Sequence, residues 1–180
     1  MNNFCRLMGD KIYLAPFRND EEALNLYTSW INDEEIGMYI MHNFSVFSLE
    51  KEKEWAEKAA KSGNNFSIIE KETDKLIGTC SIRAHANNLD FSLGIMIGDK
   101  NSRNKGYGTE AISLLLKYGF CELRAHRIWL SLNAENKRAH KCYLKNGLRD
   151  CGILHENIFF NGHYGDSIIM EILEQDYFSK

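Results

Sequence analysis

The stretch Arg-Asn-Lys-Gly-Tyr-Gly-Thr, residues 103–109, separates two segments of different periodicity. Phe91–Ile97 before it has the alternation of a strand, and the segment after it, to about Phe120, has apolar residues at helical spacing. Glycines in such a loop allow φ > 0 and a close approach, so that successive N–H groups converge on an anion at the start of the helix. Because Arg103 and Lys105 add two cations, the stretch predicts a phosphate site.

Three kinds of nucleotide loop compete for this stretch. A Walker A loop needs Gly-x-x-x-x-Gly-Lys-Ser/Thr, whereas Thr109 follows Gly108 directly, with no lysine between them. A Rossmann fingerprint needs a third glycine, where this chain has Ala111, and a parallel βαβ unit rather than the meander expected here. Two interpretations remain: a pyrophosphate site in the middle of a mixed sheet, or an ordinary turn that needs φ > 0.

The composition is that of an ordinary soluble protein. The 180 residues are 44% hydrophobic and 26% charged, which is enough for a full core and predicts one domain over residues 1–180. A net charge of −3 argues against a general nucleic-acid binder. No apolar run approaches the roughly 18 residues of a membrane span, and the first residues lack the apolar core of a signal peptide. We therefore expect a cytoplasmic protein with no nucleic-acid or membrane partner.

The spacing of cysteine and histidine predicts no metal site. The five cysteines form no Cys-x-x-Cys pair, which fits neither a disulfide framework nor zinc, so we interpret them as reduced and mostly packing residues. The six histidines include no His-Glu-x-x-His arrangement. A dedicated metal site is therefore not expected.

The order of strand-like and helix-like segments predicts a mixed α/β fold. Strands are expected at Lys11–Phe17, Asn65–Glu70, Leu76–Arg83, Phe91–Ile97, about Ile128–Leu132 and on both sides of Asn161-Gly162. Helices are expected from Asp20, at about Leu49–Lys61, after the glycine loop and at Glu135–Asn146. The order β-α-α-β-β-β-α-β-α-β-β contains no linker and no repeat, so it predicts about seven strands and about four helices.

The first two helices carry cap signals. Asp20 is placed to cap a helix whose inner face would hold Leu24, Tyr27 and Ile31. Ser48 is placed to cap the next one, whose inner face would hold Leu49, Ala56 and Ala60, with Gly63 as its stop. Between them, Gly37–Phe47 is irregular and rich in Met, Tyr, His and Phe, which is typical either of a substrate cleft or of an ordinary packed loop.

A resemblance to a known family becomes specific at two motifs. The glycine loop has the pattern Arg-x-x-Gly-x-Gly, and the run Asn-Ala-Glu-Asn-Lys-Arg-Ala-His-Lys-Cys-Tyr follows at residues 133–143. Together they resemble the GNAT superfamily of acetyl-coenzyme A dependent N-acetyltransferases, most of all the branch with ribosomal-protein N-terminal and spermidine acetyltransferases. The resemblance implies a GNAT-like, mostly antiparallel central sheet flanked by helices, and acetyl-CoA as the co-substrate.

The resemblance also implies roles for individual residues. In the family, the pantetheine arm enters between two splayed strands, one backbone N–H faces the acetyl carbonyl, and the glycine loop holds the pyrophosphate; a preorganised donor at that carbonyl stabilises the oxyanion. The matching cofactor-binding positions are Met96, Ile97, Gly98, Arg103, Asn104, Lys105, Gly106, Tyr107, Gly108, Thr109, Asn133 and Asn136. For Asn133 and Asn136, helix capping is an alternative interpretation.

Tyr143 matches the family's general acid, which protonates the departing thiolate. With tyrosine near pKa 10 and a thiol near 8.5, full proton transfer would be uphill by roughly 2 kcal/mol, so a hydrogen bond to the sulfur could suffice. The alternative is a core tyrosine at helical spacing from Ala139 and Asn136.

The general base is not evident from the sequence. Many relatives have a glutamate on the strand before the loop, where this chain has Ser92, with Asp90 two residues earlier. The remaining options are a water chain relayed by Ser92 or a base from the irregular segment, such as Glu34, Glu35 or His42. An acceptor amine of lowered pKa would need little help, since it must only lose a proton before attack.

The resemblance implies an enzyme that transfers acetyl to a primary amine by direct attack in a ternary complex. The acceptor could be a polyamine, a protein N-terminus, an amino sugar or an amino acid; Tyr39–Asn43 carries no carboxylate for a polycation, although Asp33, Glu34 and Glu35 lie close by. A catalytically weak coenzyme A sensor or scaffold, and a purely structural domain, are the competing classes. Exposed sheet edges could pair two chains as a homodimer.

Overall fold

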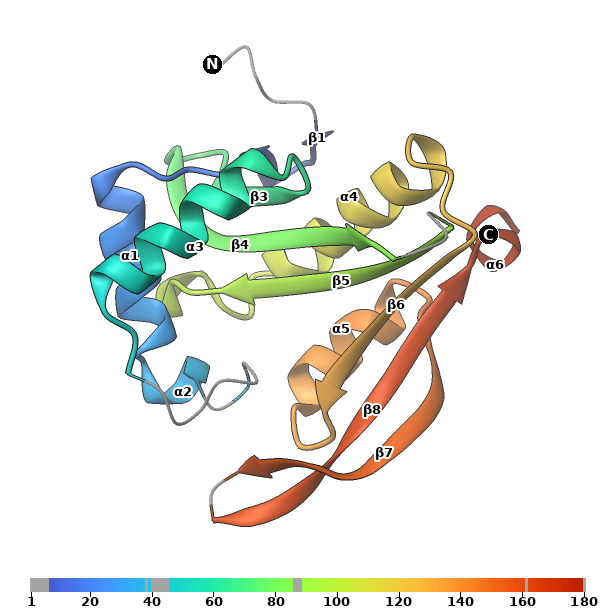
Figure 1. The fold of residues 1–180 in the computed structure, drawn as a ribbon. Helices are drawn as coiled ribbons and strands as arrows, with labels where there is room; N and C mark the ends of the chain where they lie inside the picture. Colours follow the sequence, from blue (N-terminus) through green and yellow to red (C-terminus); the bar gives the residue numbers. More distant parts are fainter. Residues whose placement is uncertain (1–6, 38, 40–45, 86–88, 161, 180) are drawn as a thin grey trace. The chain divides into compact units, whose positions relative to one another are not determined.

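The computed structural model describes residues 7–37, 39, 46–85, 89–160 and 162–179. The strands are β1 (Leu7–Met8), β2 (Ile12–Pro16), β3 (Asn65–Glu70), β4 (Lys75–Ala84), β5 (Asp90–Ile97), β6 (Arg127–Asn133), β7 (Arg149–Phe160) and β8 (His163–Leu173). The helices are α1 (Glu21–Ile31), α2 (Glu34–Gly37), α3 (Leu49–Lys61), α4 (Tyr107–Cys121), α5 (Lys137–Lys145) and α6 (Glu174–Phe178), with a 3-10 turn at Lys100–Ser102 (Figure 1).

The expected mixed α/β fold is confirmed. The eight strands follow the order β1-β2-β3-β4-β5-β6-β8-β7, with β5 and β6 parallel and the pairs β1–β2, β2–β3, β3–β4, β6–β8 and β7–β8 antiparallel. Eight strands and six helices in the described residues replace the expected seven and four. The additions, β1, α2 and α6, have two, four and five residues, which is too short for a periodic signal.

The chain divides into two compact units, which we describe separately. The first unit comprises Met1–Ser81 and Ile95–Leu114, and the second comprises Ile82–Gly94 and Leu115–Lys180. The division falls within β4, β5 and α4. The expectation of a single domain over residues 1–180 stays a prediction.

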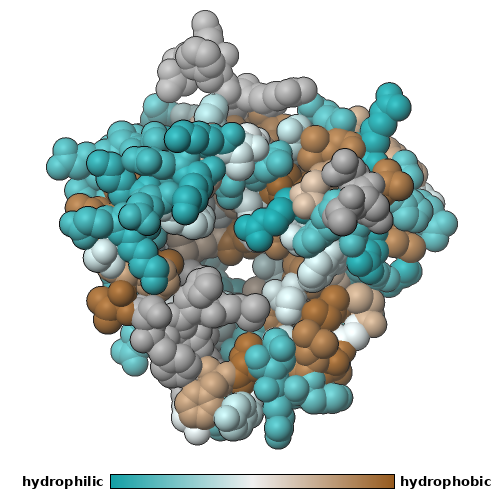
Figure 2. Space-filling view, in the orientation of Figure 1, coloured by the Kyte–Doolittle hydropathy of each residue, from teal (hydrophilic) through white to brown (hydrophobic). Residues whose placement is uncertain are grey.

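The first unit buries the inner faces of α1 and α3. Tyr27 lies at the centre, 1% exposed, and its hydroxyl is 3.0 Å from that of Ser67 on β3. The surrounding buried cluster is Phe17, Ala23, Leu24, Trp30, Ile36, Ala56, Ala59, Ile69 and Leu76. The outer face of α3 is strongly charged, and Figure 2 shows hydrophilic side chains gathered over this helix. An amphipathic helix of this kind is held by its apolar stripe rather than by propensity alone.

The two predicted caps are confirmed, with one correction to the inner face of α3. Asp20 accepts a hydrogen bond from the N–H of Ala23, and Ser48 accepts one from that of Lys51. The expected inner residue Leu49 is 42% exposed, because the first residue of the helix lies off the buried stripe; Glu52, Ala56 and Ala59 are the buried ones.

The second unit packs α4 closely on the sheet. A Cβ at Gly119 would lie 2.5 Å from Ile128 Cδ1 and 2.9 Å from Ile82 Cδ1, so the glycine allows the helix to approach the strands. Ile128, Leu130 and Leu132 are buried on β6, as their alternation predicts. β7 and β8 form the expected hairpin, whose long two-stranded ribbon is visible in Figure 1; Asn161 lies outside the described residues.

Four other expectations concern the segment Gly37–Phe47, the cysteines, a membrane span and a metal site. Most of Gly37–Phe47 and all of Cys5 lie outside the described residues. In the described part of the chain, Cys80 is buried but Cys121 and Cys151 are exposed, so packing does not account for those two. In the same residues, no helix combines the length and apolarity that a membrane crossing needs, and no group of three or more His, Cys, Asp or Glu could hold a metal ion.

Candidate active site

The glycine loop of the first unit leads directly into α4. Asn104 has φ 62° and Gly106 has φ 89°, so the loop turns through the left-handed region twice before the helix begins at Tyr107. The first bond of the helix joins the N–H of Glu110 to the C=O of Gly106 at 3.0 Å. The N–H groups of Tyr107 and Gly108 precede this bond and have no acceptor within the helix, as an anion site requires.

The two glycines serve different purposes. Gly106 is needed for its positive φ, whereas Gly108 lies inside the first turn of α4 without one. A Cβ at Gly108 would meet only ordinary contacts, 3.7 Å from Ile97 Cγ1 and 3.9 Å from Ile95 Cδ1. Of the two glycines, Gly106 is therefore the one that uses the positive φ that glycine allows. Thr109 lies in the same first turn.

Arg103 is the most informative side chain of the loop. It is only 12% exposed, and its Nη1 donates to Oε2 of Glu35 at 3.0 Å. Its Nε and Nη2 are buried and have no hydrogen-bond partner in the described part of the chain. A buried N–H group without an acceptor costs free energy, and more so when it belongs to a charged group. The guanidinium is therefore suited to bind an anionic ligand through these two nitrogens.

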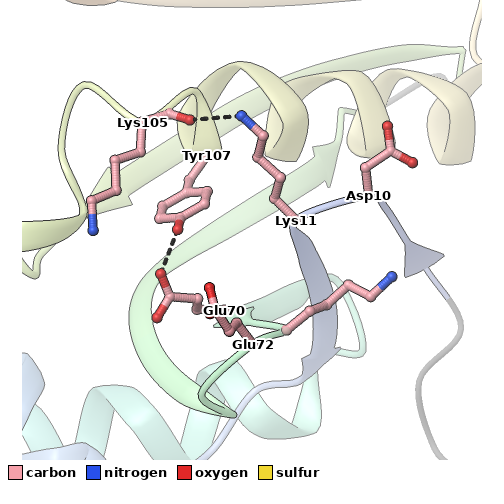
Figure 3. Close-up of a pocket in the computed structure, with 7 residues that line it drawn as sticks. Asp10, Lys11, Glu70, Glu72, Lys105 and Tyr107 are labelled. Atoms are coloured by element: carbon pink, nitrogen blue, oxygen red, sulfur yellow. Dashed lines mark hydrogen bonds between the residues drawn. The ribbon is translucent and has the colours of Figure 1, made fainter.

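Lys105 and Tyr107 line a cleft of about 680 Å³ in the first unit. Figure 3 shows the Nζ of Lys11 pointing to the C=O of Lys105, 3.2 Å away, and the hydroxyl of Tyr107 donating to the carboxylate of Glu70. That carboxylate raises the pKa of Tyr107 to about 12. The remaining lining residues are Asp10, Lys71 and Glu72, so charges of both signs meet in this cleft.

Met96, Ile97 and Gly98 close the strand before the loop. The N–H of Gly98 donates to the C=O of Ile77 at 3.0 Å, so it is already used within the first unit. A Cβ at Gly98 would lie 2.0 Å from Cδ2 of Trp30, which makes this position a close approach between α1 and the end of β5. Of these three residues, Gly98 is therefore the one whose backbone N–H group already has an acceptor within the protein.

The two predicted asparagines lie in the second unit and differ in role. Asn136 is the N-cap of α5, and its Oδ1 accepts the N–H of Ala139 at 3.1 Å, which agrees with the capping interpretation. Asn133 is 7% exposed; its Oδ1 accepts the N–H of Glu135 at 2.8 Å, but its Nδ2 is buried without a partner in the described residues. Asn133 is therefore the stronger ligand candidate.

Tyr143 also lies in the second unit, near the end of α5, and is 8% exposed. Burial raises the pKa of its phenol. A raised pKa keeps the hydroxyl protonated at every physiological pH, so Tyr143 can donate a hydrogen bond but is a weak proton source. This favours the donation of a hydrogen bond to a thiolate over complete proton transfer.

The candidate bases have different surroundings. The carboxylate of Asp90 accepts two hydrogen bonds from Arg127, both at 3.1 Å, and Glu35 is paired with Arg103 and Lys100. Glu34 is exposed on α2, and His42 lies outside the described residues.

Ser92 has a partner that the sequence did not indicate, because His85 Nε2 lies 3.0 Å from its Oγ.

A row of polar side chains on β6 was also not predicted from the sequence. Trp129 Nε1 and Ser131 Oγ, like Asn133 Nδ2, are buried without partners in the described residues. Residues 129, 131 and 133 alternate with the buried Ile128, Leu130 and Leu132, so they lie on the opposite face of the strand. That alternation is the signal that could have identified them.

Comparisons with known proteins agree with this arrangement. The family model "Acetyltransferase (GNAT) domain" matches residues 11–149. The uncharacterized N-acetyltransferase YnaD of Bacillus subtilis is 29% identical over 159 residues, 88% of this chain and 90% of that protein. The spermidine N(1)-acetyltransferase of Escherichia coli K12 is 33% identical over 78 residues, 43% of this chain and 42% of that protein.

Solved structures share the fold. A GNAT acetyltransferase from Bacillus anthracis superimposes with a TM-score of 0.82 at 24% identity, covering 94% of this chain and 98% of that one. The spermidine N-acetyltransferase of Vibrio cholerae in complex with CoA and spermine also gives 0.82 at 24% identity, covering 94% and 99%.

Proposed function

This chain belongs to the acetyltransferase (GNAT) family, and we propose that it transfers an acetyl group from acetyl-CoA to a primary amine by direct attack in a ternary complex. The observation that carries the proposal is the buried, half-partnered guanidinium of Arg103 beside the glycine loop. Its Nε and Nη2 have no acceptor among the described residues, at the place where the family resemblance expects a pyrophosphate.

The loop would hold the cofactor by charge and by backbone N–H groups. Arg103 supplies charge-assisted hydrogen bonds, the first turn of α4 supplies N–H groups, and Lys105 adds a second cation. The cofactor supplies a thioester, whose carbonyl carbon is open to attack. Met96 and Ile97 are the proposed backbone partners of the pantetheine arm.

Tyr143 is proposed to act at the leaving sulfur. As the amine nitrogen bonds to the carbonyl carbon, the C–S bond breaks and negative charge collects on the sulfur. The buried phenol stays protonated and donates to that sulfur, which stabilises the charge most in the transition state. Asn133, with its unpartnered Nδ2, is proposed to bind the cofactor near the same helix.

The charges around α2 favour a small amine or a peptide N-terminus over a polycation. Asp33 is 3.0 Å from Lys100, and Glu35 is paired with both Lys100 and Arg103. These cations lower the pKa values of the two carboxylates and neutralise them within the protein. Of the three carboxylates, only Glu34 has no such pair in the described residues. Two of the three carboxylates that could bind a polyamine are therefore already paired with cations of the protein.

A coenzyme A sensor or scaffold remains the second candidate. The observation in its favour is that Asp90, the carboxylate nearest to Ser92 along β5, is held by two hydrogen bonds from Arg127 and is not available as a base. A sensor would bind acetyl-CoA tightly and release no thiol with any amine.

An amine panel with thiol detection tests both candidates. Acetyl-CoA would be incubated with spermidine, glycine, an aminoglycoside and peptides with different N-termini, and thiol release would be followed. We expect release with at least one amine and a rise in melting temperature with acetyl-CoA. Binding without turnover would support the sensor, and no binding at all would overturn both candidates.

A further inference from the structure

We propose that His85 and Ser92 form the proton acceptor of the reaction, with the imidazole of His85 taking the ammonium proton of the acceptor amine through the hydroxyl of Ser92. This inference rests on the proposed acetyl transfer. It assigns the base that the sequence does not reveal, and it draws only on residues of the second unit.

The imidazole is held by two contacts. Its Nε2 lies 3.0 Å from Oγ of Ser92, and its ring lies against that of Trp129 with centroids 5.3 Å apart and planes inclined by 34°. Ser92 and Trp129 are themselves register partners on β5 and β6. The contacts come from two neighbouring strands, so the ring is fixed in position and orientation, as a proton acceptor requires.

The pair stands at the start of a polar row. Side chains alternate along a strand, so Trp129, Ser131 and Asn133 share one face of β6, and Ser92 lies on that same face beside Trp129. The opposite face carries Ile128, which packs on α4. Each of the three β6 residues has a buried polar atom without a partner in the described part of the chain. Such atoms suit a polar ligand that lies along the row.

The pairing of β6 leaves room for that ligand within the second unit. On one side β6 pairs with β8 over its whole length, from Arg127 to Asn133. On the other side its register with β5 covers Arg127–Trp129 only. Ser92 is therefore the last β5 residue in that register, at the point where the row of unpartnered atoms begins.

The carboxylates on the strands around His85 are already paired with arginines. On the adjoining strands the charged groups on this face are Asp90, Arg127 and Glu171, since Trp129 is the register partner of Glu171. Asp90 accepts from Arg127, and Glu171 is paired with Arg127 at 3.4 Å and with Arg149 at 3.5 Å. Arg83 on β4 is exposed. His85 and the exposed Arg83 are thus basic groups without an ionic partner in the described residues, and His85 is the one that contacts Ser92.

The proton leaves the ammonium group before the amine attacks. In the neutral imidazole with a proton on Nδ1, Nε2 accepts the hydroxyl proton of Ser92 while the Ser92 oxygen takes one from the ammonium group. The nitrogen lone pair then forms the N–C bond and the C–S bond breaks, while Tyr143 donates a hydrogen bond to the departing sulfur. The new amide nitrogen loses its second proton to that sulfur, so the products are the amide, the free thiol and a protonated His85. Histidine suits this role because its charge changes between about pH 5 and 8.

The decisive variant is His85→Gln, assayed with the panel amine that the wild-type protein turns over fastest. Glutamine can still bond to Ser92 but cannot take the proton. We expect kcat/KM at pH 7.5 to fall about 100-fold, at the low end for general base catalysis. The loss should shrink towards pH 9.5, where the amine deprotonates in solution, and the Kd for acetyl-CoA should not change. A merely structural role of His85 would not give this pH dependence.

Two further variants make the test specific. His140→Gln removes another imidazole of the same unit, one that is bonded to Asp150 at 2.8 Å, and should leave kcat/KM within about twofold. Ser92→Glu in the His85→Gln background supplies a carboxylate at the relay position and should restore at least tenfold in kcat/KM. Equal activity and pH profile of His85→Gln and wild type would overturn the base assignment alone. A wild-type protein that releases no thiol with any amine would overturn the proposed function as well.

Discussion

Among the described residues, two regions hold buried side-chain polar atoms without hydrogen-bond partners, and the two regions differ in charge. In the first unit, Arg103 presents two N–H donors of a cation that is held on one side by Glu35. In the second unit, Trp129, Ser131 and Asn133 present neutral groups at alternate positions of one strand. Both regions contain polar atoms that can still form hydrogen bonds with a ligand, but only the atoms of the first region belong to a charged group.

The difference indicates a division of labour. A guanidinium contact with a phosphate is the same before and after acetyl transfer, so it adds affinity without favouring the transition state. Neutral groups beside a proton acceptor bind and orient the reacting parts, so their removal should lower turnover. Substitutions in the first region should therefore change Kd, and substitutions in the second should change kcat. Four substitutions distinguish an effect on Kd from an effect on kcat or on stability.

Tyr143→Phe should have the largest effect, lowering kcat about 100-fold or more, because the sulfur loses its hydrogen-bond donor. The Kd for acetyl-CoA, measured by calorimetry, should stay within about twofold, since the removed hydroxyl interacts with charge that develops only in the reaction. Unchanged turnover would show that Tyr143 is only a core residue of α5.

Arg103→Gln should weaken acetyl-CoA binding by about 10- to 100-fold, since hydrogen bonds to charged groups contribute about 1.5–3 kcal/mol. At saturating cofactor its kcat should match that of wild type. Arg18→Gln is the control, because this arginine is paired with Asp20 and Glu22 away from the loop. Equal loss of affinity in both variants would mean that general charge, rather than the loop, attracts the cofactor.

Ser131→Ala should separate activity from stability. Its hydroxyl is buried without a partner in the described residues, so removing it should raise the free energy of unfolding, by about 1 kcal/mol. The same change should lower kcat/KM by about 2- to 10-fold, through one lost hydrogen bond to the ligand. Ser167→Ala is the matched control, because Ser167 is fully buried and accepts from Asn157 at 2.9 Å. That variant should lose stability, as urea unfolding would show.

Asp20→Ala should affect neither region and only lower stability, by about 1 kcal/mol at pH 7, through loss of the α1 cap. Arg18 and the N–H of Ala23 lower the pKa of Asp20 to about 2. Because this is below the unfolded value of about 3.9, the charged cap stabilises fully above about pH 4 and is lost as the pH falls towards 2. The gap between wild type and variant should therefore narrow at pH 2.5. Ser48→Ala removes an uncharged cap, and its effect should not change over that range.

Local patterns predicted the long elements of the fold. The bounds of α3 and β3 agree with the predicted ones, because a cap residue, a glycine or a change of periodicity marks each end within a few residues. β2 ends at the single proline, Pro16, one residue before the predicted end at Phe17. The elements that were missed, such as α2 with four residues, are formed by tertiary packing around Ile36 rather than by a local signal.

The candidate site was predictable only where its residues are contiguous. The glycine loop could be identified from seven consecutive residues, but the Glu35 partner of Arg103 is 68 residues away in the chain. His85 and Ser92 are close in sequence, yet no periodicity predicts the contact between their side chains. The register of β5 with β6 places Trp129 beside Ser92, and register is a property of the folded sheet.

The bond between Glu35 and Arg103 bears on product inhibition. It fixes the guanidinium before any ligand arrives, so the loss of arginine rotamer freedom, about 2 kcal/mol at most, is incurred during folding rather than at binding. The preorganised loop is proposed to contact the pyrophosphate, and acetyl-CoA and coenzyme A both contain this group. We therefore expect coenzyme A to compete with acetyl-CoA at comparable affinity. The rate of acetylation would then depend on the ratio of acetyl-CoA to coenzyme A rather than on the concentration of either compound.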